Sequence, residues 1–458
     1  MASTDPQPRT DDRLIARLAR NIGWLLSGQG VTGLFSLIYL AVAARSLGPK
    51  PFGIFMVVLT YAQLFANIIQ FQSWKGVIRF GALHLSAGDR DRLSRLLGFT
   101  AALDWSSALV GAALAAAGAF VLAPLFGWSP DIQHKAALFA AALLLTTGAT
   151  ATGMLRLFDR FDLLIYCEAF SPTVRLIGAI IAWLSGGGVS AFLLVWALAA
   201  LAQTSATWIA ALLIHRRRLS ILKGSLKSAV RENPGLWRFM WQTSLAGSFD
   251  FFWVQAGTLA VGAFAGPALA GGYRLADRIA TSIAKPTETI TRALYPELAR
   301  LVASDDRDTL RKLFRRTAGI SVGLAAVVIL IAATAGRLIL RLIAGKHFEF
   351  AQPFLLILAI SAAINIAGFS LEPFHNAHGR SGRVLRARVV GTVAYLLLLV
   401  LVLPKFGALG AAIATAITSA VIVTQLALSA RQILRHGSVK ASTPLVADPL
   451  SEADIAQG

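Results

Sequence analysis

Apolar runs long enough to cross a bilayer constrain this chain more than any other feature. A transmembrane helix needs about 20 apolar residues, and runs of that order recur along nearly the whole sequence. Charged residues make up 14% of the chain, against about 25% in soluble domains. This composition excludes a soluble globular protein and predicts an all-α polytopic membrane protein. About twelve spans are predicted, over residues 21–44, 52–73, 96–124, 136–156, 163–185, 190–214, 239–264, 268–293, 316–343, 351–374, 385–404 and 408–431.

Lys and Arg are unevenly distributed between the loops. They gather at Arg216–Arg218 and between Arg307 and Arg316, whereas loops such as Gly186–Gly188 and Phe406–Gly407 are short and uncharged. Because basic loops stay in the cytoplasm, both termini are predicted to be cytoplasmic. The predicted organisation is a cytoplasmic N-terminal segment (1–20), an N-lobe with spans one to six (21–214), a basic cytoplasmic linker (215–238), a C-lobe with spans seven to twelve (239–431) and a disordered cytoplasmic tail (432–458).

The net charge of +20 does not indicate a nucleic-acid partner. The basic residues lie in short loops between apolar spans and form no continuous polar surface. The single cysteine, Cys167, excludes an internal disulfide. We therefore expect membrane lipids around the protein and no nucleic acid.

The two halves of the chain share short motifs at a nearly constant offset. A G-P-x-x-x-G motif starts at Gly48 and again at Gly266, and a D-R-D-x-L motif starts at Asp89 and again at Asp306. Matches in the same order and in equivalent loops indicate a tandem repeat. With six spans per repeat both halves insert the same way up, which predicts two parallel six-helix repeats around a central cavity. Such an architecture suits alternating access.

The D-R-D motifs allow two interpretations. Each aspartate precedes an amphipathic stretch, so Asp89 and Asp306 are well placed as helix N-caps. We take the two stretches as short interfacial helices beneath the membrane. The alternative is a metal-binding motif of nucleotide-sugar transferases.

Basic side chains lie where a membrane helix should be apolar, between Gly266 and Glu297. At about 100° per residue they fall within roughly 40° of one another and span about 27 Å, close to the thickness of a bilayer core. Each cation would cost about 2.5–3.5 kcal/mol if it faced lipid. The stripe is therefore predicted to line a wet cavity and to bind substrate phosphates. Its members are Arg274, Arg278, Lys285 and Arg292.

A structural interpretation of the stripe stays open. The cations could instead form internal ion pairs with Asp277, Asp250 or Glu288, and Arg292 could simply mark the helix end. Intramembrane carboxylates often bind protons or cations in transporters, so Asp250 and Glu288 are predicted ion-coupling sites. For Asp250 a role as structural partner of an arginine is equally open.

Further polar residues lie inside or at the ends of predicted spans. The second span presents polar residues at helical spacing, and a looser match between the halves places two arginines at equivalent positions. Other intramembrane polar residues are weaker candidates for proton sites: Glu168, Asp104, Glu372 and His375. The secondary cavity candidates are Gln63, Asn67, Lys75, Arg79, Arg175 and Arg388.

Motifs of soluble enzymes are missing from the sequence. There is no G-x-x-x-x-G-K-[ST] loop, no Cys/His metal spacing and no G-x-S-x-G elbow. We expect no catalytic residues, no metal site and no cofactor.

Two stretches resemble a known family. These are Ser27-Gly28-Gln29-Gly30 through Gly48-Pro49-Lys50-Pro51-Phe52-Gly53, and Phe406-Gly407-Ala408-Leu409-Gly410. They are similar to bacterial polysaccharide flippases of the multidrug/oligosaccharidyl-lipid/polysaccharide (MOP) exporter superfamily, over about residues 15–435. The resemblance implies two lobes around a cationic cavity. It also implies flipping of undecaprenyl-diphosphate-linked oligosaccharide across the bacterial inner membrane in O-antigen or exopolysaccharide biosynthesis. Carried over by property, Arg274, Arg278 and Lys285 would contact the diphosphate.

Other functions stay open at this point. A multidrug exporter of the same superfamily would need an acidic or aromatic cavity, whereas this one reads as basic. A membrane polysaccharide polymerase or glycosyltransferase would need a long outer loop or a catalytic domain, and no such segment is predicted. For a flippase, the driving force would be the membrane voltage or a proton gradient coupled through Asp250 or Glu288. The expected partners are the lipid-linked oligosaccharide, membrane lipids and other polysaccharide-assembly proteins, and a monomer is the default.

Overall fold

The computed structural model describes the chain outside residues 1–32, 34, 216–225, 284–306, 379 and 437–458. The described residues form helices and connecting turns without a β-strand, which confirms the all-α prediction. Nine described helical stretches are long and apolar enough to cross a membrane. The number twelve stays a prediction, because the spans predicted at 21–44, 239–264 and 268–293 contain undescribed backbone or side chains.

The first half of the chain forms one bundle. It begins with the apolar helix Phe35–Leu47. The second and fourth predicted spans are each broken, between α2 and α3 and between α6 and α7. The helices are α2 (Pro49–Ile69), α3 (Ser73–Ser86), α4 (Arg90–Val121), α5 (Ala123–Phe126), α6 (Pro130–Leu145), α7 (Ala149–Leu157), α8 (Phe161–Leu184) and α9 (Val189–His215).

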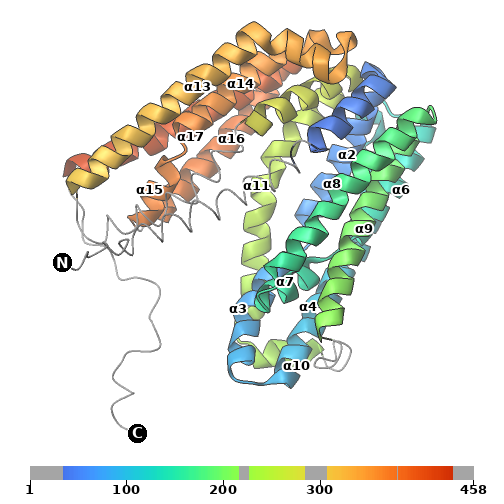
Figure 1. The fold of residues 1–458 in the computed structure, drawn as a ribbon, viewed down its shortest axis with the longest axis vertical. Coiled ribbons are helices and arrows are strands. Elements are labelled where there is room, and N and C mark those ends of the chain that lie inside the picture. Colours follow the sequence, from blue (N-terminus) through green and yellow to red (C-terminus); the bar gives the residue numbers. More distant parts are fainter. Residues whose placement is uncertain (1–32, 34, 216–225, 284–306, 379, 437–458) are drawn as a thin grey trace, which may run out of the picture.

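The second half forms a matching bundle, except that the helix over residues 226–232 and the start of the helix over residues 236–264 pack on the first half of the chain (Figure 1). A short helix, α10, lies within the predicted basic linker, and a helix over residues 267–283 follows α11. The tenth predicted span is broken between α14 and α15. The helices are α10 (Leu226–Glu232), α11 (Leu236–Phe264), α13 (Arg307–Ala344), the 3₁₀ helix η1 (Lys346–Ala351), α14 (Gln352–Ala367), α15 (Leu371–Ala377), α16 (Ser381–Phe406) and α17 (Ala408–His436).

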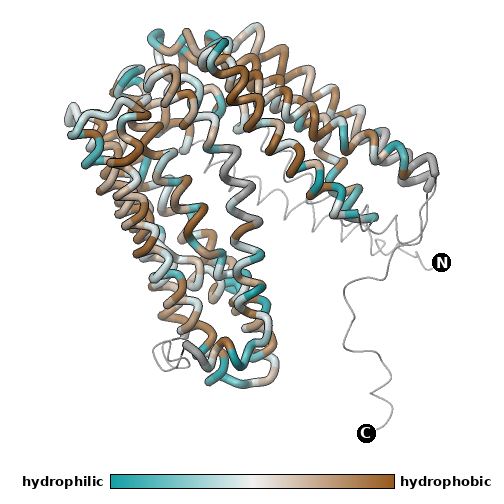
Figure 2. The backbone as a smooth tube through the Cα atoms, turned by 180° about the vertical axis from the view of Figure 1, so that it is seen from behind, coloured by the Kyte–Doolittle hydropathy of each residue, from teal (hydrophilic) through white to brown (hydrophobic). Residues whose placement is uncertain are grey.

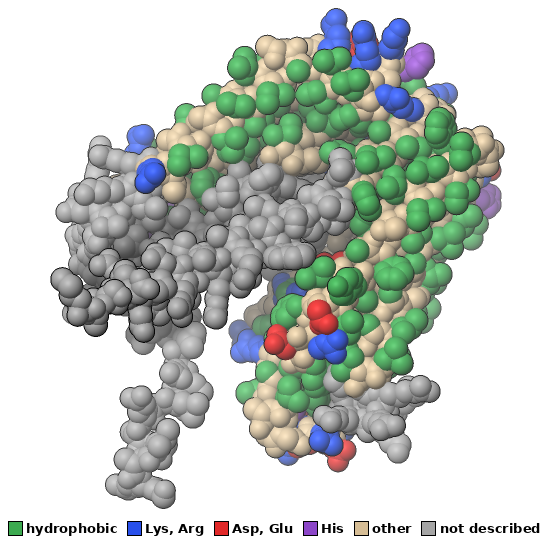
Figure 3. Space-filling view, in the orientation of Figure 1, with side chains coloured by type: hydrophobic (Ala, Val, Ile, Leu, Met, Phe, Trp, Pro, Cys, Tyr) green, Lys and Arg blue, Asp and Glu red, His purple; other side chains and the backbone are tan. Residues whose placement is uncertain are grey.

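The two bundles form a V, which we describe as an N-lobe and a C-lobe. They meet at one end, called here the lobe junction, and diverge toward their free ends (Figure 1). Apolar residues follow the middle of the helices and hydrophilic residues gather at helix ends (Figure 2). Hydrophobic side chains cover the flanks, while Lys and Arg gather at the lobe junction and near the free ends (Figure 3). This distribution is that of helices embedded in a bilayer.

Equivalent helices pack in the same way in the two lobes. In the N-lobe α4 packs on α6 and α8 on α9, and in the C-lobe α13 packs on α14 and α16 on α17. The broken spans also correspond, since α6 and α14 are both 16-residue helices followed by a short helix. The structure therefore contains the two parallel repeats that the motif spacing predicts.

The repeated G-P-x-x-x-G motifs contact each other at the lobe junction. Gly48 and Gly266 precede their helices with φ of 73° and 86°, a conformation that favours glycine. Across the junction, a Cβ at Gly271 would lie 2.8 Å from the Cα of Gly53. A Cβ at Gly53 would overlap the carbonyl of Pro267. The second glycine of each motif thus lets the two lobes touch backbone to backbone.

An arginine and an aromatic pair extend this contact. Arg45 of the N-lobe donates from Nη2 to the Leu342 carbonyl (2.5 Å) and from Nε to the Ile343 carbonyl (3.2 Å) in the C-lobe. These carbonyls belong to the last turn of α13, where helix carbonyls lack intrahelical partners and a cation is favoured. The rings of Phe52 and Phe348 meet edge to face at 5.3 Å. The lobe junction is therefore held by polar and apolar contacts between the repeats.

The first D-R-D motif caps a helix as predicted, but the helices that follow the two motifs are long rather than short. The Asp89 carboxylate accepts from the Arg92 amide at 3.0 Å, so the N-cap prediction is confirmed there, and this bond lowers the pKa of Asp89. The expected short interfacial helices are wrong, because α4 runs unbroken for 32 residues and α13 for 38. Neither helix contains a proline, and each continues without a break past its first glycine, Gly98 in α4 and Gly319 in α13. Asp306 lies outside the described residues.

Breaks within the N-lobe spans are stabilised by a buried carboxylate. Asp104 of α4 accepts hydrogen bonds from the Ser73 hydroxyl and from the amide (2.8 Å) and hydroxyl (2.7 Å) of Thr150. Ser73 starts α3 and Thr150 lies in the first turn of α7. Asp104 thus satisfies amide and hydroxyl donors at two helix N-termini, which explains how the spans can break at membrane depth. These contacts indicate a structural role rather than a proton site.

Replacing Asp104 by alanine is expected to lower the stability of the N-lobe. The change leaves buried donors on two helices without an acceptor, at a cost of about 2–4 kcal/mol. Thermal unfolding of the purified protein in detergent should show a lower midpoint. The matched control is Asp91→Ala on the same helix, where the side chain is exposed. Equal midpoints for the two variants would contradict this role.

Candidate functional site

The helix over residues 267–283 carries the first two cations of the predicted stripe. It starts at Pro267, whose fixed φ suits a first helical position. Arg274 and Asp277, one turn apart, form an ion pair at 3.1 Å, with side chains 16% and 21% exposed. Asp277 is one of the acidic partners that the sequence offered for the stripe. The pair orients the Arg274 guanidinium and neutralises part of its charge.

Arg278, one turn further on, has no ion-pair partner among the described residues. Its charge interacts with Asp277 and with Arg175 of α8. Arg175 belongs to the N-lobe and Arg278 to the C-lobe, so the two lobes bring like charges together. Such an arrangement needs a counter-charge, and the Asp277 carboxylate supplies only part of it.

Aromatic side chains hold Arg175 in place. Its guanidinium carbon lies 3.7 Å from the centre of the Trp196 ring, and its side chain contacts the Tyr39 hydroxyl. The Tyr39 and Trp196 rings pack edge to face at 5.4 Å. The Nε of Arg175 is buried and has no hydrogen-bond partner among the residues that the structure describes. Tyr39 also interacts electrostatically with Arg274 and Arg278, so the charges of all three arginines act on it.

The helix over residues 267–283 is anchored to the rest of the C-lobe by tyrosines. The hydroxyls of Tyr273 and Thr415 lie 3.3 Å apart. Gly257 of α11 faces the hydroxyls of Tyr273 and Tyr395, where a Cβ would lie 2.7 Å and 2.5 Å from them. The absence of a side chain at Gly257 lets the two tyrosines pack against α11. This packing fixes the height of Arg274 and Arg278 relative to the lobe junction.

Arg175, Arg274, Arg278 and Asp277 form what we call the cationic cluster. Three guanidinium groups and one carboxylate leave a net charge of +2. Arginine presents paired donors that match the oxygens of a phosphate. The cluster can therefore bind an anion with several phosphate oxygens near the lobe junction. Among the described residues, no group of His, Cys, Asp and Glu could hold a metal ion.

Several predicted site residues lie outside what the structure describes. These include the lower half of the stripe and one of the two ion-coupling candidates. The backbone of Asp250 lies in α11, but its side chain is outside the described set. The others are Lys285, Glu288 and Arg292.

Gln63 and Asn67 of α2 lie at the contact between the lobes. Gln255 of α11 donates to the Gln63 side chain at 3.3 Å. The hydroxyl of Ser248, also in α11, donates to the Asn67 carbonyl at 3.1 Å. The polar face of the second predicted span therefore forms hydrogen bonds with α11. No described contact joins Gln63 or Asn67 to the cationic cluster.

Three other candidate cations have local partners away from the cluster. Lys75 lies over the ring of Trp74 (5.5 Å), and Arg79 lies over the ring of Phe239 (4.7 Å). Arg388 donates to both carboxylate oxygens of Glu372 at 3.1 Å. The structure therefore brings Arg175 to the cluster but leaves its repeat equivalent, Arg388, in an exposed ion pair.

The sequence did not single out every residue that shapes this region. Tyr39 and Trp196 looked like ordinary apolar residues of their spans. Arg156 stood at the cytoplasmic end of a predicted span, where the positive-inside rule accounts for it. In the structure its guanidinium lies 4.4 Å over the ring of Trp74. The available signal was an arginine and a tryptophan at the inner ends of two spans, which is too common to be diagnostic.

Comparisons with known proteins identify related sequences and structures of similar fold. The family model described as "Polysaccharide biosynthesis protein" matches residues 18–302. The inner membrane protein YghQ of Escherichia coli K12 is 29% identical over 346 residues, which are 74% of this chain and 96% of that protein. Among solved structures, an inward-facing multidrug resistance MATE family transporter of the MOP superfamily has a TM-score of 0.69 at 13% identity, covering 87% of this chain and 94% of that one. The lipid II flippase MurJ in an inward closed conformation also has a TM-score of 0.69, at 12% identity, covering 89% and 87%. These likenesses show a MOP-type fold.

Proposed function

Because this chain belongs to the polysaccharide biosynthesis protein family, we propose that it flips a lipid-linked oligosaccharide across the bacterial inner membrane. The substrate class is undecaprenyl-diphosphate-linked oligosaccharide, made for O-antigen or exopolysaccharide. The observation that carries the proposal is the cationic cluster, where the charges of Arg175 and Arg278 from opposite lobes interact and Asp277 is the one carboxylate described among three arginines. A diphosphate would supply the missing negative charge.

The V-shaped arrangement of the lobes supports translocation by alternating access (Figure 1). The diphosphate would enter between the free ends of the lobes and bind at the cluster, close to the lobe junction. Binding would remove the repulsion between Arg175 and Arg278 and draw the lobes together around the anion. Opening the junction would then release the substrate on the opposite side. The cationic cluster does not favour the organic cations expected of a multidrug exporter.

The free ends are taken as cytoplasmic in this scheme. They carry α10, which follows the Arg216–Arg218 cluster (Figure 1). Both termini would then also be cytoplasmic. Lys285 and Arg292 would extend the anion track toward that side, and Asp250 or Glu288 would couple flipping to protons if a proton gradient drives it.

The leaflet distribution of the substrate tests the proposed function. In cells depleted of this protein, lipid-linked oligosaccharide should accumulate in the inner leaflet. A membrane-impermeant reagent that oxidises sugars reports which leaflet holds it. Re-expression of the wild-type protein should restore outer-leaflet exposure. An unchanged distribution after depletion would reject the flippase and redirect the work to drug-sensitivity and polymer-length assays.

Loss of the Arg45 hydrogen bonds is expected to weaken the contact between the lobes at the lobe junction. In Arg45→Ala the last carbonyls of α13 lose a lobe-to-lobe donor, so the junction should open more often. A cysteine placed at Ala344, which is 2% exposed, should then react several-fold faster with an impermeant maleimide added from outside. Both variants are made in a Cys167→Ser background, so that the introduced cysteine is the only one that can react.

Arg337→Ala is the matched control for that measurement. Arg337 is an exposed arginine on α13, the helix whose last carbonyls Arg45 contacts, and none of the described hydrogen bonds or ion pairs involves it. If both variants label at the same rate, Arg45 does not hold the junction closed.

A further inference from the structure

Glu168 is an exposed carboxylate within a predicted membrane span. It lies on α8, seven residues from Arg175. Seven residues are almost two helical turns, so the two side chains leave the helix within about 20° of each other and about 10 Å apart along the axis. Arg175 is a member of the cationic cluster, so Glu168 leaves α8 on the side of the helix that carries the cluster. An exposed carboxylate at this depth must face water rather than lipid.

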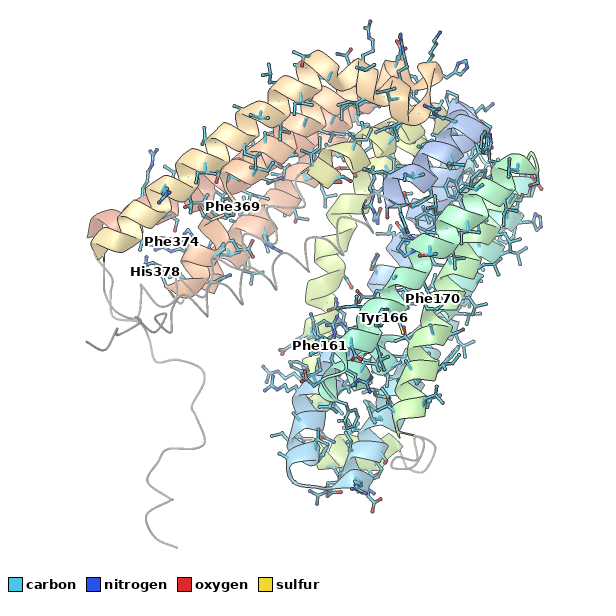
Figure 4. The ribbon with its side chains drawn as sticks, viewed as in Figure 1. Phe161, Tyr166, Phe170, Phe369, Phe374 and His378 are labelled. Atoms are coloured by element: carbon cyan, nitrogen blue, oxygen red, sulfur yellow. The ribbon has the colours of Figure 1, made fainter. Side chains whose placement is uncertain are left out.

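The position of Glu168 along α8 can be followed between labelled neighbours. Tyr166 and Phe170 flank it in sequence, and Phe161 marks the end of α8 nearer the free end of the lobe (Figure 4). Glu168 therefore lies between the cationic cluster and the free end. A substrate whose diphosphate is bound at the cluster would place its next chemical group beside this part of α8.

Arg156 is the charged group described as interacting with Glu168. The two side chains interact electrostatically without forming an ion pair in the described residues. The helix packed along α8 is α9, and its stretch Val189–Ile214 contains no charged residue. Among the described charged groups, Arg156 is therefore the one that interacts with Glu168. The Glu168 carboxylate makes no described ion pair and can bind a ligand.

The Arg156 side chain is positioned by stacking on a tryptophan ring. Its guanidinium lies 4.4 Å over the ring of Trp74, and the Lys75 ammonium lies 5.5 Å from the same ring. Its Nε is buried and has no hydrogen-bond partner within the described part of the chain. A stacked guanidinium keeps its edge free for donating hydrogen bonds. Three helices, α3, α7 and α8, thus contribute an indole, a guanidinium and a carboxylate to one wall.

The chemistry of this group differs from that of the cationic cluster. A free carboxylate repels phosphate, so Glu168 is unsuited to the diphosphate. Carboxylates accept hydrogen bonds from neighbouring hydroxyls, guanidinium groups donate to hydroxyl and carbonyl oxygens, and indole rings pack against C–H faces. Together these groups match a sugar ring.

We propose that Glu168, Arg156 and Trp74 form a saccharide subsite that binds the sugar next to the diphosphate. The inference rests on the proposed function and assigns a second part of the substrate to a second part of the cavity. The cationic cluster anchors the lipid diphosphate regardless of the sugar, and the saccharide subsite distinguishes lipids that carry a sugar from lipids that do not.

Binding of two lipids to the full-length protein in nanodiscs tests the subsite. One is undecaprenyl diphosphate, and the other is the lipid-linked oligosaccharide extracted from cells depleted of the protein. Glu168→Ala should weaken binding of the oligosaccharide lipid at least about tenfold and leave binding of undecaprenyl diphosphate within about twofold. Arg156→Lys, which keeps the charge but loses the planar guanidinium, should show the same selectivity.

Arg278→Ala separates this inference from the proposed function. That variant should weaken binding of both lipids, whereas the exposed control Arg92→Ala should change neither. If Glu168→Ala affects both lipids equally or neither of them, the saccharide subsite is wrong while the flippase stands. If Glu168→Gln leaves both affinities unchanged and shifts only the pH dependence of flipping, Glu168 is a proton site instead. If the wild-type protein binds neither lipid, the proposed function itself fails.

Discussion

Substituting Arg278 by alanine is expected to abolish flipping while the protein remains folded in the membrane. Arg278 has no ion-pair partner among the described residues, so its removal leaves no buried carboxylate without a counter-charge. Its interaction with a diphosphate would be charge-assisted and partly shielded from water, and losing it should reduce flipping by about 30-fold or more. The impermeant oxidation assay, run in depleted cells that express the variant, measures the effect.

Arg92→Ala is the matched control for Arg278→Ala. Arg92 pairs with Asp89 at 3.2 Å on the surface of α4, and its side chain is 54% exposed. Exposed pairs contribute little, so this variant should flip at the wild-type rate. Membrane abundance of both variants should match the wild type. Normal flipping by Arg278→Ala would refute the role of the cationic cluster in binding the diphosphate.

Placing a methyl group at Gly53 is expected to force the lobes apart. In Gly53→Ala the new Cβ would overlap the carbonyl of Pro267, a backbone atom that no side-chain rotation can move. Relieving the overlap requires a shift of one whole lobe, at a cost of about 2–4 kcal/mol. The purified variant should unfold at a lower temperature, and its flipping should be lost.

Gly323→Ala shows whether the effect comes from packing or from the loss of glycine. Gly323 lies inside α13, where a Cβ would meet nothing within 4 Å. Alanine at a helical glycine is intrinsically favourable by about 0.5–1 kcal/mol, so this variant should be as stable as the wild type or more so. If Gly53→Ala is equally stable, the lobes do not touch at this point in the protein as it exists in the membrane.

Much of the fold followed from patterns that are local in the sequence. The apolar runs predicted helical spans, and the nine described spans lie within or around predicted ones. The paired motifs at Gly48 and Gly266 predicted the repeat. The breaks at residues 70–72, 146–148 and 368–370 were not predicted. A break at membrane depth depends on a distant group such as Asp104, which hydropathy does not reveal.

The candidate site was predictable only in part. The sequence placed Arg274 and Arg278 on one face because helical periodicity relates residues on the same helix. It ranked Arg175 and Arg388 alike as repeat equivalents, whereas the structure brings Arg175 to the cluster and pairs Arg388 with Glu372. Arg156 was missed because its position at a helix end already had an ordinary explanation.

Three properties followed from patterns in the amino-acid sequence: which segments are helical, that they repeat, and that cations are predicted at bilayer depth. These properties depend on transfer free energy and on the period of one helix, and both are written in neighbouring residues. Which helix faces meet follows from the packing of the two lobes alone. The interaction of Arg175 with Arg278 and the contact of Gly53 with Gly271 depend on that packing, since contacts between residues far apart in the chain leave no local pattern.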